Sequence, residues 1–117
     1  MHRPLIRRLV LWGIFRVMPR VVRRKVLERE EVVIEWRITG RRDGRQDVRQ
    51  LVIEGGRAQL LPGEPREADV GLMMDGGTFV LLATGNASGP RLYLGGKLEL
   101  YGDVWLAMRL PRFFAVR

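Results

Sequence analysis

Apolar and polar side chains alternate along residues 32–39, which is the pattern of a β-strand with one buried face. Residues 47–54 and 57–61 are predicted to form a second and a third strand, and only two glycines separate them, which suits a tight hairpin loop. Strands joined by short turns pair antiparallel. Residues 31–61 are therefore predicted to form a three-stranded antiparallel sheet, and the first strand is expected to face the core with Val32, Ile34, Trp36 and Ile38.

The amino-terminal 30 residues are predicted to be helical. Pro4 suits the first turn of a helix and Pro19 would end it, so the first helix is expected over residues 4–18. Apolar side chains lie nearly all round this helix, which indicates burial on more than one side. Residues 20–30 carry valines and a leucine between charged side chains and predict a second, short helix.

The second half of the chain opens with strand and helix signals in turn. Residues 68–74 are almost entirely apolar and predict a fourth strand, which ends at Asp75. A carboxylate there can accept hydrogen bonds from the free amides of a first helical turn, so Asp75 is expected to cap a helix that carries Phe79. The stretch that follows predicts a loop, marked by Gly85, Ser88, Gly89 and Pro90.

A fifth strand and a last helix complete the chain. Leu98 and Leu100 are expected in the strand, and Asp103 is expected to cap the helix that follows it. Pro111 would end that helix, because proline lacks the amide hydrogen that a helix interior needs. The apolar side chains of this helix are Val104, Trp105, Met108 and Leu110.

Three motifs in this half read ADVGLMMDGGTFVLLATG, NASGPRLYLGGKLELYGD and VWLAMRLPRFF. Over about 47 residues they resemble the second half of the sterol carrier protein type 2 domain. That pattern is an Ala-Asp-hydrophobic strand, an Asp-led helix ending near Thr-Gly, and a Gly-Lys-Leu strand that leads through Gly-Asp into a Leu-Ala-Met helix. The resemblance implies an α+β fold with a five-stranded, largely antiparallel sheet covered on one face by helices, and an apolar cavity between sheet and helices.

The same resemblance implies a lipid-binding protein and not an enzyme. It implies non-covalent binding of a fatty acyl chain, sterol or isoprenoid, for carriage between membranes or presentation to an enzyme. The side chains expected to line the cavity are Trp12, Phe15, Met18, Phe79, Leu82, Leu92, Leu94, Trp105, Met108, Phe113 and Phe114. Each of them taken alone also fits ordinary core packing. An alternative is a non-catalytic dimerising or accessory module, in which the apolar helices form a protein interface such as that of a homodimer.

The net charge of +8 lies entirely in the amino-terminal arm, residues 1–25. The arm has seven Arg and one Lys without an acid, whereas residues 26–117 have 13 basic and 13 acidic side chains. We therefore expect a single domain in which a basic helical segment, residues 1–30, packs on a lipid-binding part, residues 31–117. The arm is either a solvated flank or a contact for an anionic membrane surface. The side chains that would make this contact are Arg3, Arg7, Arg8, Arg16, Arg20, Arg23, Arg24 and Lys25.

Residue types needed for catalysis and metal binding are scarce. There is no cysteine, and the one histidine, His2, lies at the terminus, so no catalytic group, metal site or cofactor is predicted. Asp69 and Asp75 fit strand-end and capping roles, and the glycines form no phosphate-binding loop. No base-reading motif accompanies the arginines, so nucleic acid is not an expected partner. Arg16 interrupts the apolar run of the arm, and we expect a cytoplasmic protein, peripheral at the inner face of the membrane if the arm docks.

Overall fold

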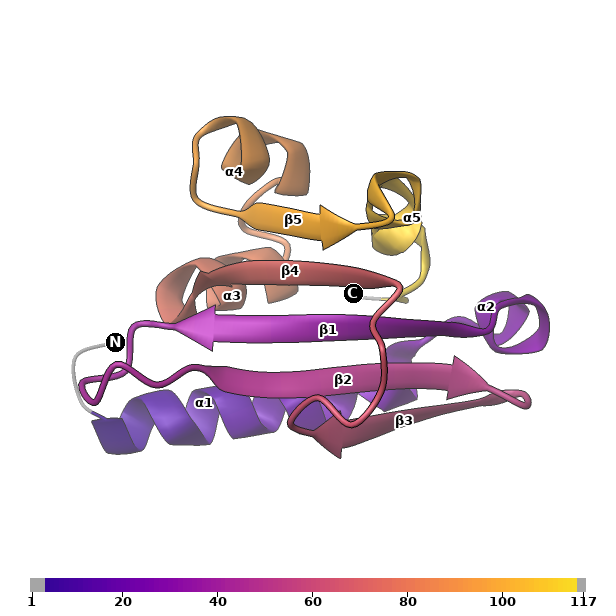
Figure 1. The fold of residues 1–117 in the computed structure, drawn as a ribbon, viewed down its shortest axis with the longest axis horizontal. Helices are drawn as coiled ribbons and strands as arrows, with labels where there is room; N and C mark the ends of the chain where they lie inside the picture. The colour runs from indigo at the N-terminus through magenta and orange to yellow at the C-terminus, as the bar shows by residue number, and fades with distance from the viewer. Residues whose placement is uncertain (1–3, 116–117) are drawn as a thin grey trace.

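The computed structural model describes residues 4–115, which are built around one five-stranded sheet (Figure 1). The strand order is β3-β2-β1-β4-β5. β1 and β4 run parallel, and the other neighbouring strands pair antiparallel. β1 therefore joins the first half of the chain to the second. The strands are β1 (Val32–Thr39), β2 (Asp47–Glu54), β3 (Arg57–Pro62), β4 (Val70–Asp75) and β5 (Glu99–Gly102).

Helices cover one face of this sheet. Figure 1 shows α1 and α3 behind it, and α5 contacts β4. Within residues 4–115, no helix is long and apolar enough to cross a bilayer. The helices are α1 (Pro4–Val17), α2 (Arg24–Arg29), α3 (Gly76–Ala83), α4 (Gly89–Leu94) and α5 (Val104–Arg109), with 3₁₀ turns η1 (Met18–Val21) and η2 (Leu110–Arg112).

The α+β class and the largely antiparallel sheet are confirmed, and so are the two predicted helix caps. A side-chain oxygen of Asp75 accepts a hydrogen bond from the amide of Thr78 at 2.7 Å. The carboxylate of Asp103 accepts one from the amide of Leu106 at 3.0 Å. Each cap satisfies an amide that the helix itself cannot satisfy, and this fixes where α3 and α5 leave the sheet.

One prediction is wrong, because α4 lies where the sequence predicts a loop. The helix begins at Gly89, and Pro90 lies in its first turn. Proline is tolerated there since the amide hydrogen it lacks has no partner within a helix. The amide of Leu92 donates to the carbonyl of Ser88 at 2.9 Å, which closes the first turn. Glycine and proline in the first turn of a helix thus have the same appearance in a sequence as the signals of a loop.

Aromatic side chains fill the centre of the layer between sheet and helices. Phe15 of α1 and Phe79 of α3 stack with their ring centroids 5.0 Å apart. The ring of Trp36 on β1 lies 5.7 Å from that of Phe79, whose side chain is only 1% exposed. The indole nitrogen of Trp36 is buried and has no hydrogen-bond partner among the described residues. The place in which the resemblance implies a cavity is therefore occupied at its centre by packed rings.

The opposite face of the sheet carries a polar network beneath the β3–β4 connection, which crosses in front of β1 and β2 in Figure 1. The side-chain amide of Gln50 donates to Glu35 at 2.8 Å and to the carbonyl of Arg66 at 2.8 Å. The hydroxyl of Tyr101 also donates to Glu35, and the Nε of Arg37 donates to the same carboxylate at 2.9 Å. This network attaches the connection to the sheet and leaves Glu35 only 4% exposed.

The surroundings of Glu35 and Tyr101 shift the pKa of both groups. Burial alone would raise the pKa of Glu35, but the hydrogen bonds from Tyr101, Gln50 and Arg37 together outweigh it and hold the pKa below its ordinary value of 4.5. Desolvation and the hydrogen bond to Glu35 raise the pKa of Tyr101 to about 12. The ionised carboxylate and the neutral phenol are therefore the forms that this face stabilises.

Candidate functional site

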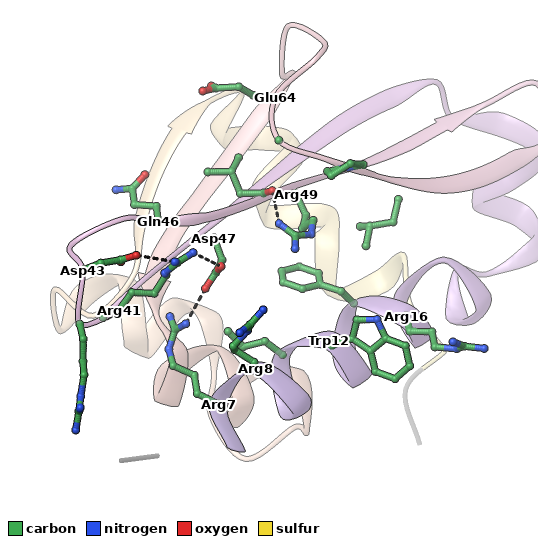
Figure 2. A pocket seen from close by; sticks show the side chains of 18 residues that line it. Arg7, Arg8, Trp12, Arg16, Arg41, Asp43, Gln46, Asp47, Arg49 and Glu64 are labelled. Carbon is green, nitrogen blue, oxygen red and sulfur yellow. Dashed lines mark hydrogen bonds and ion pairs between the residues drawn. The ribbon is translucent and has the colours of Figure 1, made fainter. Parts of the chain in front are cut away.

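A groove of ≈ 1140 Å³ lies between α1 and the end of the sheet formed by β2, β3 and the β1–β2 connection (Figure 2). Its base is apolar and includes Leu11, Phe15 and Leu60. Leu11 and Phe15 are buried, whereas Trp12, at the edge of the groove, is 59% exposed. Because Phe15 also stacks on Phe79, the floor of the groove is continuous with the hydrophobic core.

The rim of the groove is cationic. It is lined by six arginines and three acids. The arginines are Arg7, Arg8, Arg16, Arg41, Arg42 and Arg49, and the acids are Asp43, Asp47 and Glu64. An apolar floor under a charged rim is the arrangement that accommodates an amphipathic molecule, with its chain on the floor and its polar end at the rim.

Arg7 attaches α1 to the sheet. Its side chain reaches Asp47 at 2.6 Å and the carbonyl of Thr39 at 2.8 Å, and the residue is only 8% exposed. Asp47 is also bound by Arg41 at 3.2 Å, and Arg41 in turn binds Asp43 at 2.6 Å. The expectation that Arg7 faces a membrane is therefore wrong, because this side chain turns inward to hold the helix.

The remaining groove arginines are not neutralised in this way. Among the described residues, Arg8, Arg16 and Arg42 form no ion pair, and Arg49 bonds only the carbonyl of Val48, at 2.9 Å. The guanidinium carbon of Arg49 lies 5.8 Å from the centre of the Phe15 ring, and that of Arg16 lies 5.0 Å from the centre of the Trp12 ring. These contacts hold two cations where the aromatic floor meets the rim.

The structure separates the side chains that the sequence assigns to a single cavity. Trp12 and Phe15 line the groove. Met18, Phe79 and Phe113 are buried in the core, while Leu82, Leu92 and Phe114 are half-buried and pack against it. The side chains that remain exposed are Leu94, Trp105 and Met108.

The predicted membrane-contacting cations also fall into separate groups. Arg8 and Arg16 line the groove, whereas Arg20, Arg23, Arg24 and Lys25 are exposed beyond the end of α1. Arg3 lies outside the described residues.

Sequence reasoning missed the contribution of Arg41, Arg42 and Arg49 to the groove. They lie in and beside the β1–β2 turn, in a part of the chain with balanced overall charge, so composition did not single them out. The pairing of β2 with β1 gives one usable signal for Arg49. It places Arg49 opposite Trp36, so that both side chains lie on the same face of the sheet. Within residues 4–115 no group of His, Asp or Glu side chains could hold a metal ion.

Comparison with known proteins gives consistent matches. The profile of the SCP-2 sterol transfer family matches residues 20–115. Hydroxysteroid dehydrogenase-like protein 2 of Xenopus tropicalis is 26% identical over 99 residues, which are 84% of this chain but only 23% of that protein. The chain thus spans less than a quarter of that relative's length.

Solved structures share the fold. The UbiJ-SCP2 ubiquinone synthesis protein has a TM-score of 0.65 at 17% identity, over 90% of this chain and 92% of that one. Palmitated SCP2L2 from Aedes aegypti has a TM-score of 0.57 at 18% identity, over 80% and 86%. α1, which ends before residue 20, precedes the region that the family profile matches.

Proposed function

The chain belongs to the SCP-2 sterol transfer family, and we propose that it binds a lipid non-covalently and carries it or presents it to another protein. The observation that supports this proposal most strongly is the groove beside α1. It has an apolar, partly aromatic floor and a cationic rim. Its volume of ≈ 1140 Å³ is large enough to hold a small-molecule ligand. The lipid would be a fatty acyl chain, a sterol or an isoprenoid.

We place the hydrocarbon chain on the groove floor and not in the centre of the layer between sheet and helices. That centre is filled by Phe15, Trp36 and Phe79, whose rings are in contact. The floor, by contrast, already offers Leu11 and Leu60 beside an open volume. Each CH₂ group moved from water onto this floor would contribute about 0.8 kcal/mol at most, so a long chain would be retained until a membrane accepts it.

Two related structures bear on the choice of lipid. One was solved in palmitated form, and the other is named as a ubiquinone synthesis protein. A straight acyl chain and an isoprenoid are therefore both reasonable ligands to test. Organic extraction of the protein purified from its own host, followed by mass spectrometry, tests the proposal directly. The absence of any co-purifying lipid, together with failure to displace a fluorescent fatty acid, would exclude it.

We further propose that the segment after α1 docks on an anionic membrane during loading or release. Arg20, Arg23, Arg24 and Lys25 are exposed, and each cation near such a surface contributes about 1 kcal/mol. On α1 itself, Leu9 and Val17 are at least half-exposed apolar side chains that could enter the headgroup layer. Docking of this kind would place the protein at the inner face of the cytoplasmic membrane.

A protein interface is the second candidate function, and α5 favours it. Trp105 is 78% exposed and Met108 66%, which is unusual for such large apolar side chains. A second copy or another protein could cover them. Native mass measurement separates a homodimer from a lipid carrier, since a module that covers α5 with a second copy would appear as a dimer and a lipid carrier as a monomer with added lipid mass.

A further inference from the structure

The groove holds more positive charge than its own acids can balance. Asp47 is bound by Arg7 and Arg41, and Asp43 is bound by Arg41. Glu64 is bound by Arg37, whose side chain lies on the face of the sheet opposite the helices. All three groove acids are therefore engaged, and the groove guanidinium groups that pair with no carboxylate within residues 4–115 are those of Arg8, Arg16, Arg42 and Arg49.

Two of these cations face the same space. Figure 2 shows Arg8 on α1 and Arg49 on the sheet at facing sides of the groove, with the carboxylate of Asp47, which Arg7 and Arg41 already bind, beside them. Like charges that converge on one space repel each other, and an anion placed between them would remove that repulsion. The two sides of the groove are held in place, because the ion pair of Arg7 with Asp47 attaches α1 to the sheet and the guanidinium group of Arg49 lies over the ring of Phe15.

The guanidinium groups of Arg8 and Arg49 favour some classes of anion over others. A guanidinium group presents parallel N–H donors that match two oxygens of a phosphate or carboxylate. A phosphate group carries up to two negative charges and more acceptor oxygens than a carboxylate, so it can bond Arg8 and Arg49 at once. The apolar floor begins directly beneath them with Phe15 and Leu11, which provides room for a hydrocarbon chain attached to that phosphate.

We propose that the groove binds a lipid with a phosphate-class head group, a phosphate or diphosphate on an acyl or prenyl chain, with the head between Arg8 and Arg49 and the chain on Leu11, Phe15 and Leu60. This inference rests on the proposed lipid-binding function and adds the chemistry of the head group. Arg8 is contributed by α1, which precedes the part of the chain matched by the family profile. The head-group site is thus built partly from a segment that the family profile does not match.

Isothermal titration with four soluble probes tests the proposal. The probes are dodecyl phosphate, dodecanoate and dodecyl maltoside, all kept below their micelle concentrations, and inorganic phosphate. We expect dodecyl phosphate to bind at least about tenfold more tightly than dodecyl maltoside, which is the effect of one charge-assisted contact. Its affinity should also fall as salt is raised, because ionic screening weakens contacts between charged groups.

Each alternative outcome has a defined meaning. Equal binding of the three dodecyl compounds, or tighter binding of dodecanoate, overturns the head-group inference and leaves lipid binding intact. Inorganic phosphate binding as tightly as dodecyl phosphate overturns it as well, because the hydrocarbon chain would then contribute nothing. Binding of none of the four probes contradicts the proposed function together with the inference.

Variants locate the site. Arg8→Gln and Arg49→Gln should each weaken dodecyl phosphate about tenfold, and by more than they weaken dodecyl maltoside. Arg57→Gln, an exposed position on β3 that does not line the groove, is the matched control and should leave both affinities unchanged. Arg8 is exposed on α1, so its variant should fold even if Arg49→Gln does not. Equal losses for the two probes in Arg8→Gln would overturn the assignment.

Discussion

The phenol ring of Tyr101 on β5 lies directly over the backbone of Gly71 on β4, so closely that a Cβ atom on Gly71 would lie 1.9 Å from Cζ of Tyr101. The two residues are also opposite each other in the antiparallel β4–β5 pair. Glycine at this position lets the ring lie flat enough for its hydroxyl to reach Glu35 on β1. The polar network around Glu35 therefore depends on the absence of a side chain at residue 71.

Gly71→Ala is expected to lower the free energy of unfolding by about 2 kcal/mol, because the new methyl group displaces Tyr101 and leaves the buried Glu35 without one of its donors. Urea denaturation measures this change. The matched control is Gly13→Ala in α1, where an added Cβ meets nothing within 4 Å. That substitution should stabilise the protein by about 0.5–1 kcal/mol, since alanine is the better helix former. An equal effect of the two substitutions would contradict the account of the network.

The tyrosine titration is expected to show one phenol with a pKa of about 12. Desolvation and the hydrogen bond to Glu35 both disfavour the phenolate of Tyr101. Absorbance titration of a Tyr93→Phe variant, in which Tyr101 is the one remaining tyrosine, isolates this transition. A Glu35→Gln substitution in that background should move the pKa towards 10. A midpoint near 10 with Glu35 intact would show that Tyr101 does not bond the carboxylate.

Acid should destabilise the protein in part through Glu35. Its pKa is held below 4.5 in the folded state, so the ionised form contributes stability that is present above 4.5 and is lost as the pH falls through the folded-state pKa. Glu35→Gln removes this contribution, and its unfolding free energy should therefore change less between pH values of about 5 and 3 than that of the wild type. Identical pH dependence of the two proteins would contradict a lowered pKa at this position.

Arg7 is expected to stabilise the fold, whereas Arg8, the next residue of α1, is not. Arg7→Met removes the bonds to Asp47 and Thr39 and should cost about 2 kcal/mol, which is less than for a fully buried pair because Asp47 is partly exposed and keeps Arg41. Arg8→Met, the matched control, removes an exposed side chain without an ion pair among the described residues and should change stability by about 0.5 kcal/mol or less. Urea denaturation of both variants measures the two changes in the free energy of unfolding. Equal changes would show that the bonds of Arg7 do not attach α1 to the sheet.

Membrane docking should depend on the cations that follow α1. A triple substitution of Arg23, Arg24 and Lys25 by glutamine is expected to lower partitioning onto phosphatidylglycerol-containing vesicles about a hundredfold, at about 1 kcal/mol for each cation. Flotation of vesicles with bound protein gives the measurement. The same three-charge loss at other exposed positions provides the control, through glutamine substitution of Arg45, Arg57 and Arg112. Similar losses in both triple variants would mean that net charge, and not this segment, governs binding.

The fold was predictable from sequence to the extent that its signals were local. The strand over residues 32–39, the two-glycine hairpin and the Asp75 and Asp103 caps each depend on neighbouring residues, and all appear in the structure. The expectation that only one face of this strand is buried is wrong, because its first five residues are all buried. α4 was missed because proline and glycine have the same appearance in a loop and in the first turn of a helix.

The candidate site was less predictable, because it depends on contacts between distant segments. Arg7 and Asp47 are 40 residues apart, and only the packing of α1 on the sheet decides that Arg7 turns inward while Arg8 does not. The same packing brings Arg49 over Phe15. Glu35 likewise looked like an ordinary solvent-facing strand residue until the β3–β4 connection covered it. Periodicity identifies the faces of a strand, but not what lies over them.

Amide NMR during titration with dodecyl phosphate shows whether a lipid occupies the groove between α1 and the sheet. Binding in the groove should give saturable shifts that cluster on residues such as Leu11, Phe15 and Leu60, with little change on α5 around Trp105. Unchanged groove amides at saturating probe, or shifts confined to α5, would contradict it.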